Sequence, residues 1–254
     1  MAQLQAILFD IGETLLNFGK VDAIGLFKDG TSLAYDFLKK LGVNPGSYRI
    51  YLFRHLFTIR LRLFWSAIRD RDFDSYEVLK EIQTRKGVQL TQRQWDEYAG
   101  LWYEPVRKLA KVESDIIETL KKLERMGLKF GVLSNTFVHA STIDGHLAQL
   151  GLLGFFDVRL YSYQYPFRKP DKRLFLEAAK KLNVEPENIL FVGDRINTDI
   201  NGAIAAGMRA CLKKACTNPD KIGMRIDKLS ELPELVESIN RNLYQPQISQ
   251  INTD

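Results

Sequence analysis

The sequence predicts an α/β protein built on a parallel sheet, with a helical block inserted after the first strand. Two observations support this prediction. Short apolar runs alternate with helical patterns through the C-terminal two-thirds of the chain, as is typical of parallel strands joined by crossover helices. Residues from about 17 to 113 break the alternation, because they carry only helical patterns. We therefore expect a core formed by residues 1–16 and 114–244, and a helical domain formed by residues 17–113.

Short apolar runs are expected to form the strands. Such runs, bounded by turn residues, are typical of strands that a parallel sheet buries on both faces. The first run, "AILF", begins five residues after Met1 and is followed at once by Asp10. The expected strands span 6–9, 128–134, 158–162, 189–193 and 208–212.

Helical patterns fill the intervals, and several begin on a Ser, Asp or Thr that can cap a helix and end on Gly or Asn. In the core they span 114–127, 141–151, 169–183 and 198–207. In the inserted block they span 31–42, 46–70, 74–87 and 91–111. The last segment, 245–254, lacks any periodicity, and we expect it to be disordered.

Composition indicates a soluble globular protein. Of the 254 residues 45% are hydrophobic and 26% are charged, and the formal net charge is +5. That charge would attract anionic small molecules or nucleic acid. Because a mild positive charge spread over a surface mainly serves solubility, nucleic-acid binding stays an alternative that rests on charge alone, and we expect no nucleic-acid partner.

The cysteines and the N-terminus suggest a cytoplasmic location. Cys211 and Cys216 are the only cysteines, and one such pair does not make a zinc site. We expect both to be reduced, with at least one in a strand. The residues before the first strand leave no room for a signal peptide, and no apolar run approaches a membrane span. No membrane partner is expected.

Three side chains with potential chemistry follow predicted strands directly. Asp10, Ser134 and Asp194 each stand at the carboxyl end of a strand, and this edge is where parallel sheets bind ligands. A carboxylate such as Asp10 could attack a phosphorus atom and form an aspartyl-phosphate, which divides one hard displacement into two easier ones.

Other residues complement such a nucleophile. Asp10, Asp194 and Asp199 offer the hard oxygen ligands that Mg²⁺ prefers, and Lys169 adds a positive charge. The Ser134 hydroxyl could donate a hydrogen bond to the transferring oxygens. Each residue alone has an ordinary explanation as a cap or turn residue. Their occurrence together, in this order, is much more specific.

At this point the sequence resembles the haloacid dehalogenase-like hydrolase superfamily. "FDIGETL", "LSNT", "KPDKRLF" and "VGDRINTDINGAIAAGM" are similar to its motifs one to four, in a phosphatase-like branch with a helical cap between motifs one and two. The resemblance implies a Rossmann-like core, Mg²⁺ dependence and an aspartyl-enzyme intermediate. It implies these roles: catalysis by Asp10 and Lys169; phosphate binding by Ser134, Asn135 and Lys169; metal binding by Asp10, the Gly12 carbonyl, Asp194 and Asp199.

The chain departs from the superfamily's pattern at Gly12. Phosphatases of the superfamily usually have a second aspartate there, which protonates the leaving alcohol and later activates water. Glycine can do neither, and Glu13 stands one residue too late to point the same way. The main hypothesis is a Mg²⁺-dependent phosphohydrolase that acts on a small phosphorylated metabolite. The alternative is a degenerate binding or regulatory protein with little turnover. The resemblance implies that dehalogenases use no Mg²⁺, so the acidic pair Asp194 and Asp199 argues against that activity.

Two further segments allow more than one interpretation. In residues 46–70 an apolar stripe at helical spacing is interrupted by arginines; we expect burial within the helical domain with arginines at its edges. Alternatives are a homodimer interface, a gate for an anionic substrate, or an RNA-binding face. The loop at 161–168 carries four aromatic residues that either pack under the cap or stack on a substrate ring. Arg195 could hold an acidic substrate group or a neighbouring carboxylate. The histidines, expected to be ordinary polar residues, are His55, His139 and His146.

Overall fold

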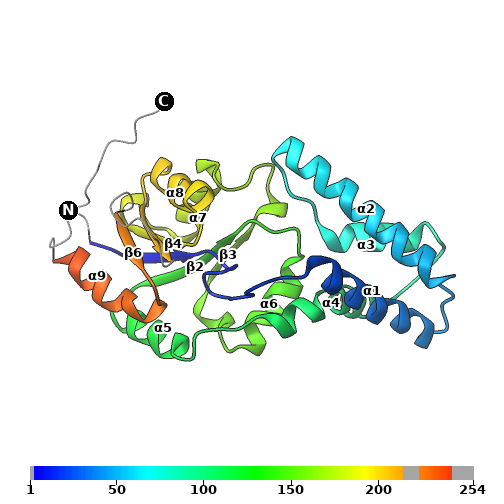
Figure 1. Ribbon diagram of the computed structural model, residues 1–254. Coiled ribbons are helices and arrows are strands. Elements are labelled where there is room, and N and C mark those ends of the chain that lie inside the picture. The colour runs from blue at the N-terminus through cyan, green and yellow to red at the C-terminus, as the bar shows by residue number, and fades with distance from the viewer. Residues whose placement is uncertain (1–2, 214–222, 242–254) are drawn as a thin grey trace.

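The computed structural model describes residues 3–213 and 223–241, and within them six parallel strands form one sheet in the order β3-β2-β1-β4-β5-β6 (Figure 1). The predicted α/β, Rossmann-like fold is confirmed. The strands are β1 Ala6–Phe9, β2 Lys129–Ser134, β3 Val158–Tyr161, β4 Ile189–Gly193, β5 Arg209–Lys213 and β6 Met224–Ile226. The last strand was not predicted, because three residues are too few to show a pattern. Cys211 lies buried in β5; Cys216 and the tail 245–254 lie outside the described residues.

Helices occur between the strands much as the sequence predicts. Those of the core are α5 Ile116–Arg125, α6 Ala140–Gln149, α7 Lys172–Leu182, α8 Asn201–Ala205 and α9 Leu232–Asn240. Those of the inserted block are α1 Ala23–Lys40, α2 Tyr48–Arg69, α3 Ser75–Thr84 and α4 Gln92–Leu109. Short 3₁₀ turns span Leu153–Phe155, Ser162–Gln164, Pro186–Asn188 and Leu229–Glu231.

The sheet is covered on both faces. Ile7 and Phe9 point into a cluster with side chains of α5, α6 and α9, whereas Ala6 and Leu8 point into a second cluster formed with α7 and α8. This division follows from the two-residue period of a strand. It also explains the unbroken apolar run in β1, because neither face of the strand meets water.

Strand order decides which loops meet at the carboxyl edge. β1 lies between β2 and β4, and Phe9 is in register with Val132 on one side and with Val192 on the other. Consequently the residues that follow β1 and β4 emerge side by side. The chain continues from β1 to β2 on one side of it, whereas β4, which the chain reaches from β3 through α7, lies on its other side. Such a switch point is where open α/β sheets form ligand crevices.

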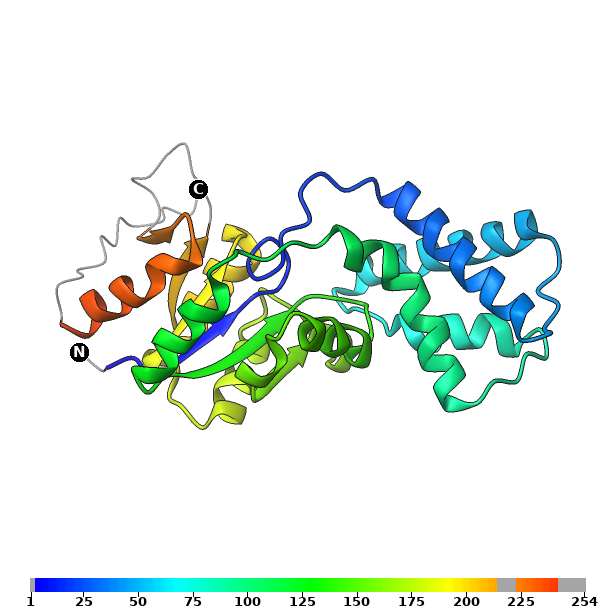
Figure 2. The same ribbon diagram turned by 90° about the horizontal axis from the view of Figure 1, so that it is seen from below.

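The inserted helices α1–α4 group together at one end of the molecule, beyond the sheet (Figure 2). They have their own apolar cluster, which includes Leu38, Trp95 and Tyr98. The segments that enter and leave the block are joined, because Asn17 and Lys111 exchange two backbone hydrogen bonds of 2.8 Å. These residues stand near the boundaries 17 and 113 predicted from sequence, and the block's independence as a domain stays a prediction.

Helix α1 begins eight residues earlier than the sequence pattern indicates. Its N-cap is Asp22, whose carboxylate accepts a hydrogen bond from the Gly25 N–H at 3.0 Å. Two glycines hid this first half, since glycine weakens a helical pattern. Gly30 has a packing reason: a Cβ there would lie 2.6 Å from the Trp102 carbonyl oxygen, so α1 and α4 can approach closely only at a glycine.

The expected burial of the apolar stripe on α2 is wrong. Its side chains stand 44–68% exposed, because α2 packs against the other inserted helices with its opposite face, Tyr51, His55, Ile59 and Ser66. The exposed stripe consists of Ile50, Phe53, Phe57, Leu61, Phe64 and Ile68. Despite this apolar surface, no helix among the described residues is long and apolar enough to cross a membrane.

A buried polar network fixes α2 on its neighbours. His55 is fully buried; its Nδ1 donates to the Tyr51 carbonyl at 2.7 Å, and its Nε2 accepts from the Gln83 amide at 3.0 Å. The Gln83 amide also donates to the Tyr98 hydroxyl at 3.0 Å, and the Tyr51 and Tyr98 hydroxyls are 2.6 Å apart. One donor and one acceptor nitrogen mean that the ring is neutral, and burial lowers the pKa of His55 from 6.5 to about 4.

This pKa predicts a loss of stability in acid. Between pH 6.5 and pH 4 the unfolded chain protonates His55 and the folded chain does not, so the free energy of unfolding decreases as the pH falls through this range. At pH 4.5 the loss from this residue is about 2–3 kcal/mol. Urea unfolding at pH 7.5 and 4.5 should show that wild-type protein loses more stability than His55→Asn by about this amount. Equal losses in the two proteins would contradict the assignment.

Candidate active site

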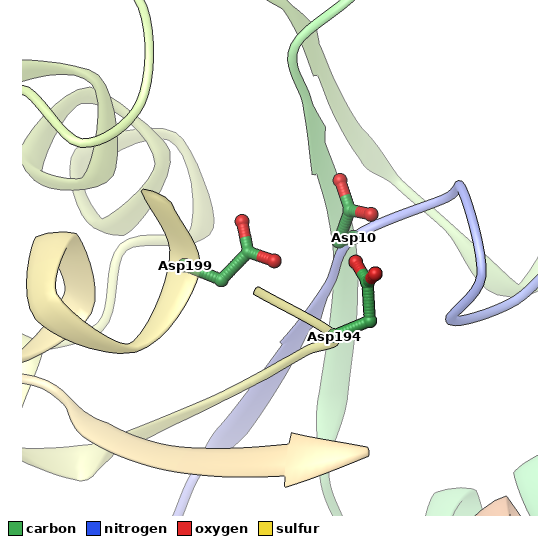
Figure 3. Close-up of side chains that lie close together, drawn as sticks. All are labelled: Asp10, Asp194 and Asp199. Carbon is green, nitrogen blue, oxygen red and sulfur yellow. The ribbon is translucent and has the colours of Figure 1, made fainter. Parts of the chain in front are cut away.

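Three carboxylates converge at the carboxyl edge of the sheet (Figure 3). Asp10 directly follows β1, Asp194 directly follows β4, and Asp199 lies in the turn that leads into α8. One oxygen from each lies within 4.8 Å of the others. Asp10 and Asp199 are buried, and Asp194 is partly buried. The strand order therefore brings together the three acids that the sequence predicts as metal ligands.

Asp199 is positioned by an unusual turn. Residues Ile196–Ile200 form a π-helical turn, so the α-helix expected over 198–207 begins only at Asn201. The Asp199 carboxylate accepts the Arg195 N–H at 3.0 Å. A Cβ on Gly193 would lie 2.6 Å from the Asp199 side chain, so only glycine at the end of β4 allows the carboxylate to approach this closely.

Lys169 lies between two of these acids. Its Nζ is 2.6 Å from Asp10 Oδ1 and 2.7 Å from Asp199 Oδ1, and only 3% of the residue is exposed. Burial alone would lower the pKa of Lys169, but the charges of the two carboxylates outweigh it and raise the pKa above its usual value. The ammonium group is therefore permanently charged, and it is the positive partner of both acids.

The backbone of Lys169 is fixed by Asn135. The Asn135 amide donates to the Lys169 carbonyl at 2.8 Å, and its carbonyl oxygen accepts the Lys169 N–H at 2.8 Å. Asn135 was predicted as a phosphate ligand from its place in "LSNT". In the structure its side chain holds the lysine backbone and the residue also lines the site cavity, and its role as a phosphate ligand stays a prediction.

The site carries more negative than positive charge. Burial raises the pKa of Asp10 despite the opposing charge of Lys169. Burial, together with the charges of Asp10 and Asp199, raises the pKa of Asp194 to about 6. Three crowded carboxylates and one ammonium group form a site that a further cation would stabilise, and carboxylate oxygens are the ligands that hard divalent cations prefer.

The predicted residues line one cavity of about 300 Å³, apart from Asp194, which borders it through Asp10 and Asp199. Those lining it are Asp10, Gly12, Ser134, Asn135, Lys169 and Asp199. Phe18, Val21 and Thr198 also line it and were not predicted. Thr198 directly precedes Asp199, so its position in the motif could have indicated it. Phe18 and Val21 carry no chemical signal in the sequence.

In the loop after Asp10, the Glu13 carboxylate is already engaged, and there is space beside Gly12. The Glu13 carboxylate accepts the Phe18 N–H at 3.0 Å, so it is engaged in holding the loop. Glu13 adopts a positive φ of 56°, which is uncommon for a residue with a side chain. At Gly12 an added Cβ would meet only the Phe18 ring, at 3.9 Å. A larger side chain at position 12 therefore fits the cavity.

The aromatic loop before Lys169 packs against the protein. The Tyr161 hydroxyl donates to Asp144 at 2.6 Å, and the Tyr163 hydroxyl accepts the Ala140 N–H at 2.8 Å. Arg168 ends the loop and binds the residues that follow α2: its guanidinium group donates to Asp70 and to Asp72, each at 2.9 Å. The loop thus connects the core to the inserted helices directly beside Lys169.

The comparisons with known proteins agree with this geometry. A family model described as haloacid dehalogenase-like hydrolase matches residues 4–207, and the chain belongs to this family of enzymes. A protein named glyceraldehyde 3-phosphate phosphatase from Methanopyrus kandleri is 38% identical over 37% of this chain and 40% of its own length. One of the same name from Methanothermobacter thermautotrophicus is 29% identical over 65% of this chain and 81% of its own.

Solved structures of similar fold include phosphatases and dehalogenases. A phosphatase of this superfamily from Thermococcus onnurineus superimposes with a TM-score of 0.58 at 26% identity, over 92% of this chain and 98% of its own. The first of the two named relatives is matched over less than half of its length, so shared activity with it is a matter of proposal.

Removal of the buried Lys169 ammonium group should destabilise the fold. Lys169→Met leaves Asp10 and Asp199 without their positive partner, and breaking a buried ion pair costs roughly 3–5 kcal/mol. We expect urea unfolding at pH 7.5 to show such a loss. At pH 5 the loss should be smaller, because unpartnered carboxylates take up protons. Lys172→Met, which changes an exposed lysine, is the control. A Lys169→Met protein as stable as the control at pH 7.5 would contradict the ion-pair assignment.

Proposed function

We propose that the protein is a Mg²⁺-dependent phosphohydrolase that acts on a small phosphorylated metabolite through an aspartyl-phosphate intermediate. The observation that carries the proposal is the placement of Lys169 between Asp10 and Asp199, with Asp194 beside them. Phosphatase-named relatives and membership of the hydrolase family support it. Glyceraldehyde 3-phosphate, named for those relatives, belongs in any substrate panel.

The donor set fits a magnesium ion. Asp10, Asp194 and Asp199 would supply carboxylate oxygens, and Gly12 would supply its backbone carbonyl, which needs no side chain. The three carboxylates lie close together, and the pKa values of Asp10 and Asp194 are raised. Such a cluster of oxygen ligands suits a small, hard cation. When bound, Mg²⁺ would neutralise charge on the phosphoryl oxygens and so reduce the repulsion between substrate and nucleophile.

Asp10, Lys169 and Ser134 would carry out nucleophilic attack and stabilise the transferring oxygens. Asp10 Oδ1 is bound to Lys169, so the other carboxylate oxygen, Oδ2, would attack phosphorus. The new O–P bond would form as the bond to the leaving alcohol breaks, and water would then hydrolyse the acyl phosphate to return Asp10 and inorganic phosphate. Lys169 would hold Asp10 in position and stabilise the transferring oxygens, and the Ser134 hydroxyl would donate to them.

Proton transfer is the weak point of this site, because Gly12 has no acid to offer and Glu13 is engaged by Phe18. General acid–base help contributes about 10²–10⁴-fold to a rate. Aryl phosphates, whose phenolates leave without protonation, should therefore be hydrolysed much better than alkyl phosphates. The alternative function, a degenerate binding or regulatory protein, corresponds to a site in which this deficit suppresses turnover of all natural esters.

Replacement of the nucleophile tests the mechanism. Asp10→Asn keeps the shape of the side chain but removes its nucleophilic oxygen anion, so hydrolysis of p-nitrophenyl phosphate should fall by about 10³-fold or more. The assay is run with Mg²⁺ and with a chelator, and chelation should abolish wild-type turnover. Asp157→Asn, an exposed aspartate outside the site, serves as the matched control and should keep full activity. Activity retained in Asp10→Asn would reject the aspartyl-phosphate route.

Restoration of an acid at position 12 separates the two functions. Gly12→Asp should raise kcat/KM, which reports formation of the aspartyl-phosphate, by about 10²–10⁴-fold on alkyl phosphates and far less on p-nitrophenyl phosphate. If wild-type protein shows negligible turnover of every alkyl phosphate and the variant gains strongly, the degenerate function is favoured. If wild-type protein already turns over an alkyl ester efficiently and the variant gains nothing, the proton comes from another group and the protein is a working phosphatase.

The remaining expectations about partners stay predictions. The exposed apolar stripe of α2 is the surface through which a homodimer, one of the alternatives that the sequence allows, would form. A cytoplasmic location remains an expectation from the sequence, and the family's chemistry gives no reason to add a nucleic-acid or membrane partner.

A further inference from the structure

A second cavity adjoins the cavity of about 300 Å³ that Asp10 and Lys169 line. It measures about 370 Å³, and Val21 lines both. The loop that follows β2 also runs from one to the other, since Ser134 and Asn135 line the first cavity and Phe137 and Val138 line the second. The two cavities are therefore neighbours at Val21, in the inserted block, and along the loop after β2, in the core.

The second cavity is apolar. Its walls come from α1, α2 and α4 on one side and from the loop after β2 on the other. Apolar side chains that form these walls include Leu26, Phe27, Leu63, Val106, Phe137 and Val138. Such a lining contrasts with the first cavity, where carboxylates, an amide and an ammonium group dominate.

Two polar side chains of the second cavity have partners, whereas the Trp102 indole N–H, which also belongs to its lining, is buried without a hydrogen-bond partner. The Tyr103 hydroxyl is 3.1 Å from His146 Nδ1, and His139 Nδ1 is 2.8 Å from the Ser141 hydroxyl. A ligand hydroxyl placed there would find few free donors or acceptors, and burial of an unpaired polar group costs roughly 1–3 kcal/mol. Each buried methylene group, by contrast, contributes about 0.8 kcal/mol.

We propose that the 370 Å³ cavity binds the organic part of the substrate, and that this part is apolar: an alkyl or aryl body carried on the phosphate. This inference rests on the proposed function, because it assigns the phosphoryl group to the cavity of Asp10 and Lys169. Short polyol phosphates would fill the polar cavity and leave the apolar one without a ligand. Selectivity for the body then comes from apolar area, with the Trp102 indole N–H as the one unpaired buried donor among the described lining residues.

Binding of non-hydrolysable ligands tests the inference without turnover. Benzylphosphonate, 4-propylbenzylphosphonate and 4-(3-hydroxypropyl)benzylphosphonate share the same phosphonate and differ only in the tail. With Mg²⁺ present, calorimetric titration should show the propyl compound binding about 10-fold or more tightly than benzylphosphonate, and the hydroxypropyl compound losing most of this gain. Equal affinities for the three would overturn the inference.

A matched pair of variants on α1 tests whether the propyl tail binds in this cavity. Leu26 lines the cavity and is partly buried, whereas Ile24, two residues away on the same helix, is 54% exposed and does not line it. Leu26→Asn should reduce the propyl advantage several-fold, and Ile24→Asn should leave it unchanged. Thermal melts confirm that both variants fold. A propyl advantage that survives Leu26→Asn places the tail elsewhere and contradicts the assignment.

Hydrolysis of the corresponding aryl phosphates separates this inference from the proposed function. Phenyl and 4-propylphenyl phosphate have leaving groups of similar acidity, so a higher kcat/KM for the second reports the tail. Turnover of both with no preference, together with equal phosphonate affinities, refutes the apolar site and keeps the phosphatase. Tight phosphonate binding without any turnover supports the apolar site and refutes the phosphatase.

Discussion

The double ion pair of Lys169 with Asp10 and Asp199 is the interaction on which the rest of the site depends. The three residues come from segments far apart in the chain: the end of β1, the loop before α7, and the turn before α8. Their charges are removed from water, which is unfavourable unless geometry is good and every group is paired. The parallel sheet provides that geometry, because its order places β1 beside β4 and its two covered faces keep water from the edge where the acids emerge.

Much of this arrangement could be predicted from the sequence. Buried strands of a parallel sheet are apolar on both faces, so β1 and β4 are visible as short runs, and their ends show where Asp10 and Asp194 must appear. Lys169 and Asp199 could be placed because their motifs follow in the expected order. The packing reasons were less visible: that Gly193 must lack a Cβ because Asp199 lies against it follows only from the coordinates.

Other features could not be predicted because they depend on which face a helix presents. α2 is apolar around most of its circumference, and only contacts with Tyr98 and Gln83 decide that the His55 face is the buried one. The start of α1 was hidden by glycines whose purpose is close packing on α4. Phe18 and Val21 carry no chemical signal, and yet Phe18 lines the polar cavity and Val21 lines both cavities.

The ion pairs of Arg168 with Asp70 and Asp72 connect the inserted helices to the residue next to it in the chain, Lys169. Arg168 is held from one side by Asp70 and by the mostly buried Asp72, and the next residue, Lys169, is held from the other side by Asn135. The peptide unit between Arg168 and Lys169 thus joins contacts with the residues that follow α2 to contacts with the core. The bond to the mostly buried Asp72 contributes most of this connection, because Asp70 is 80% exposed and an exposed ion pair contributes only about 0–1 kcal/mol. An outward movement of the inserted helices would therefore cost either the Arg168–Asp72 bond or the position of Lys169 beside Asp10.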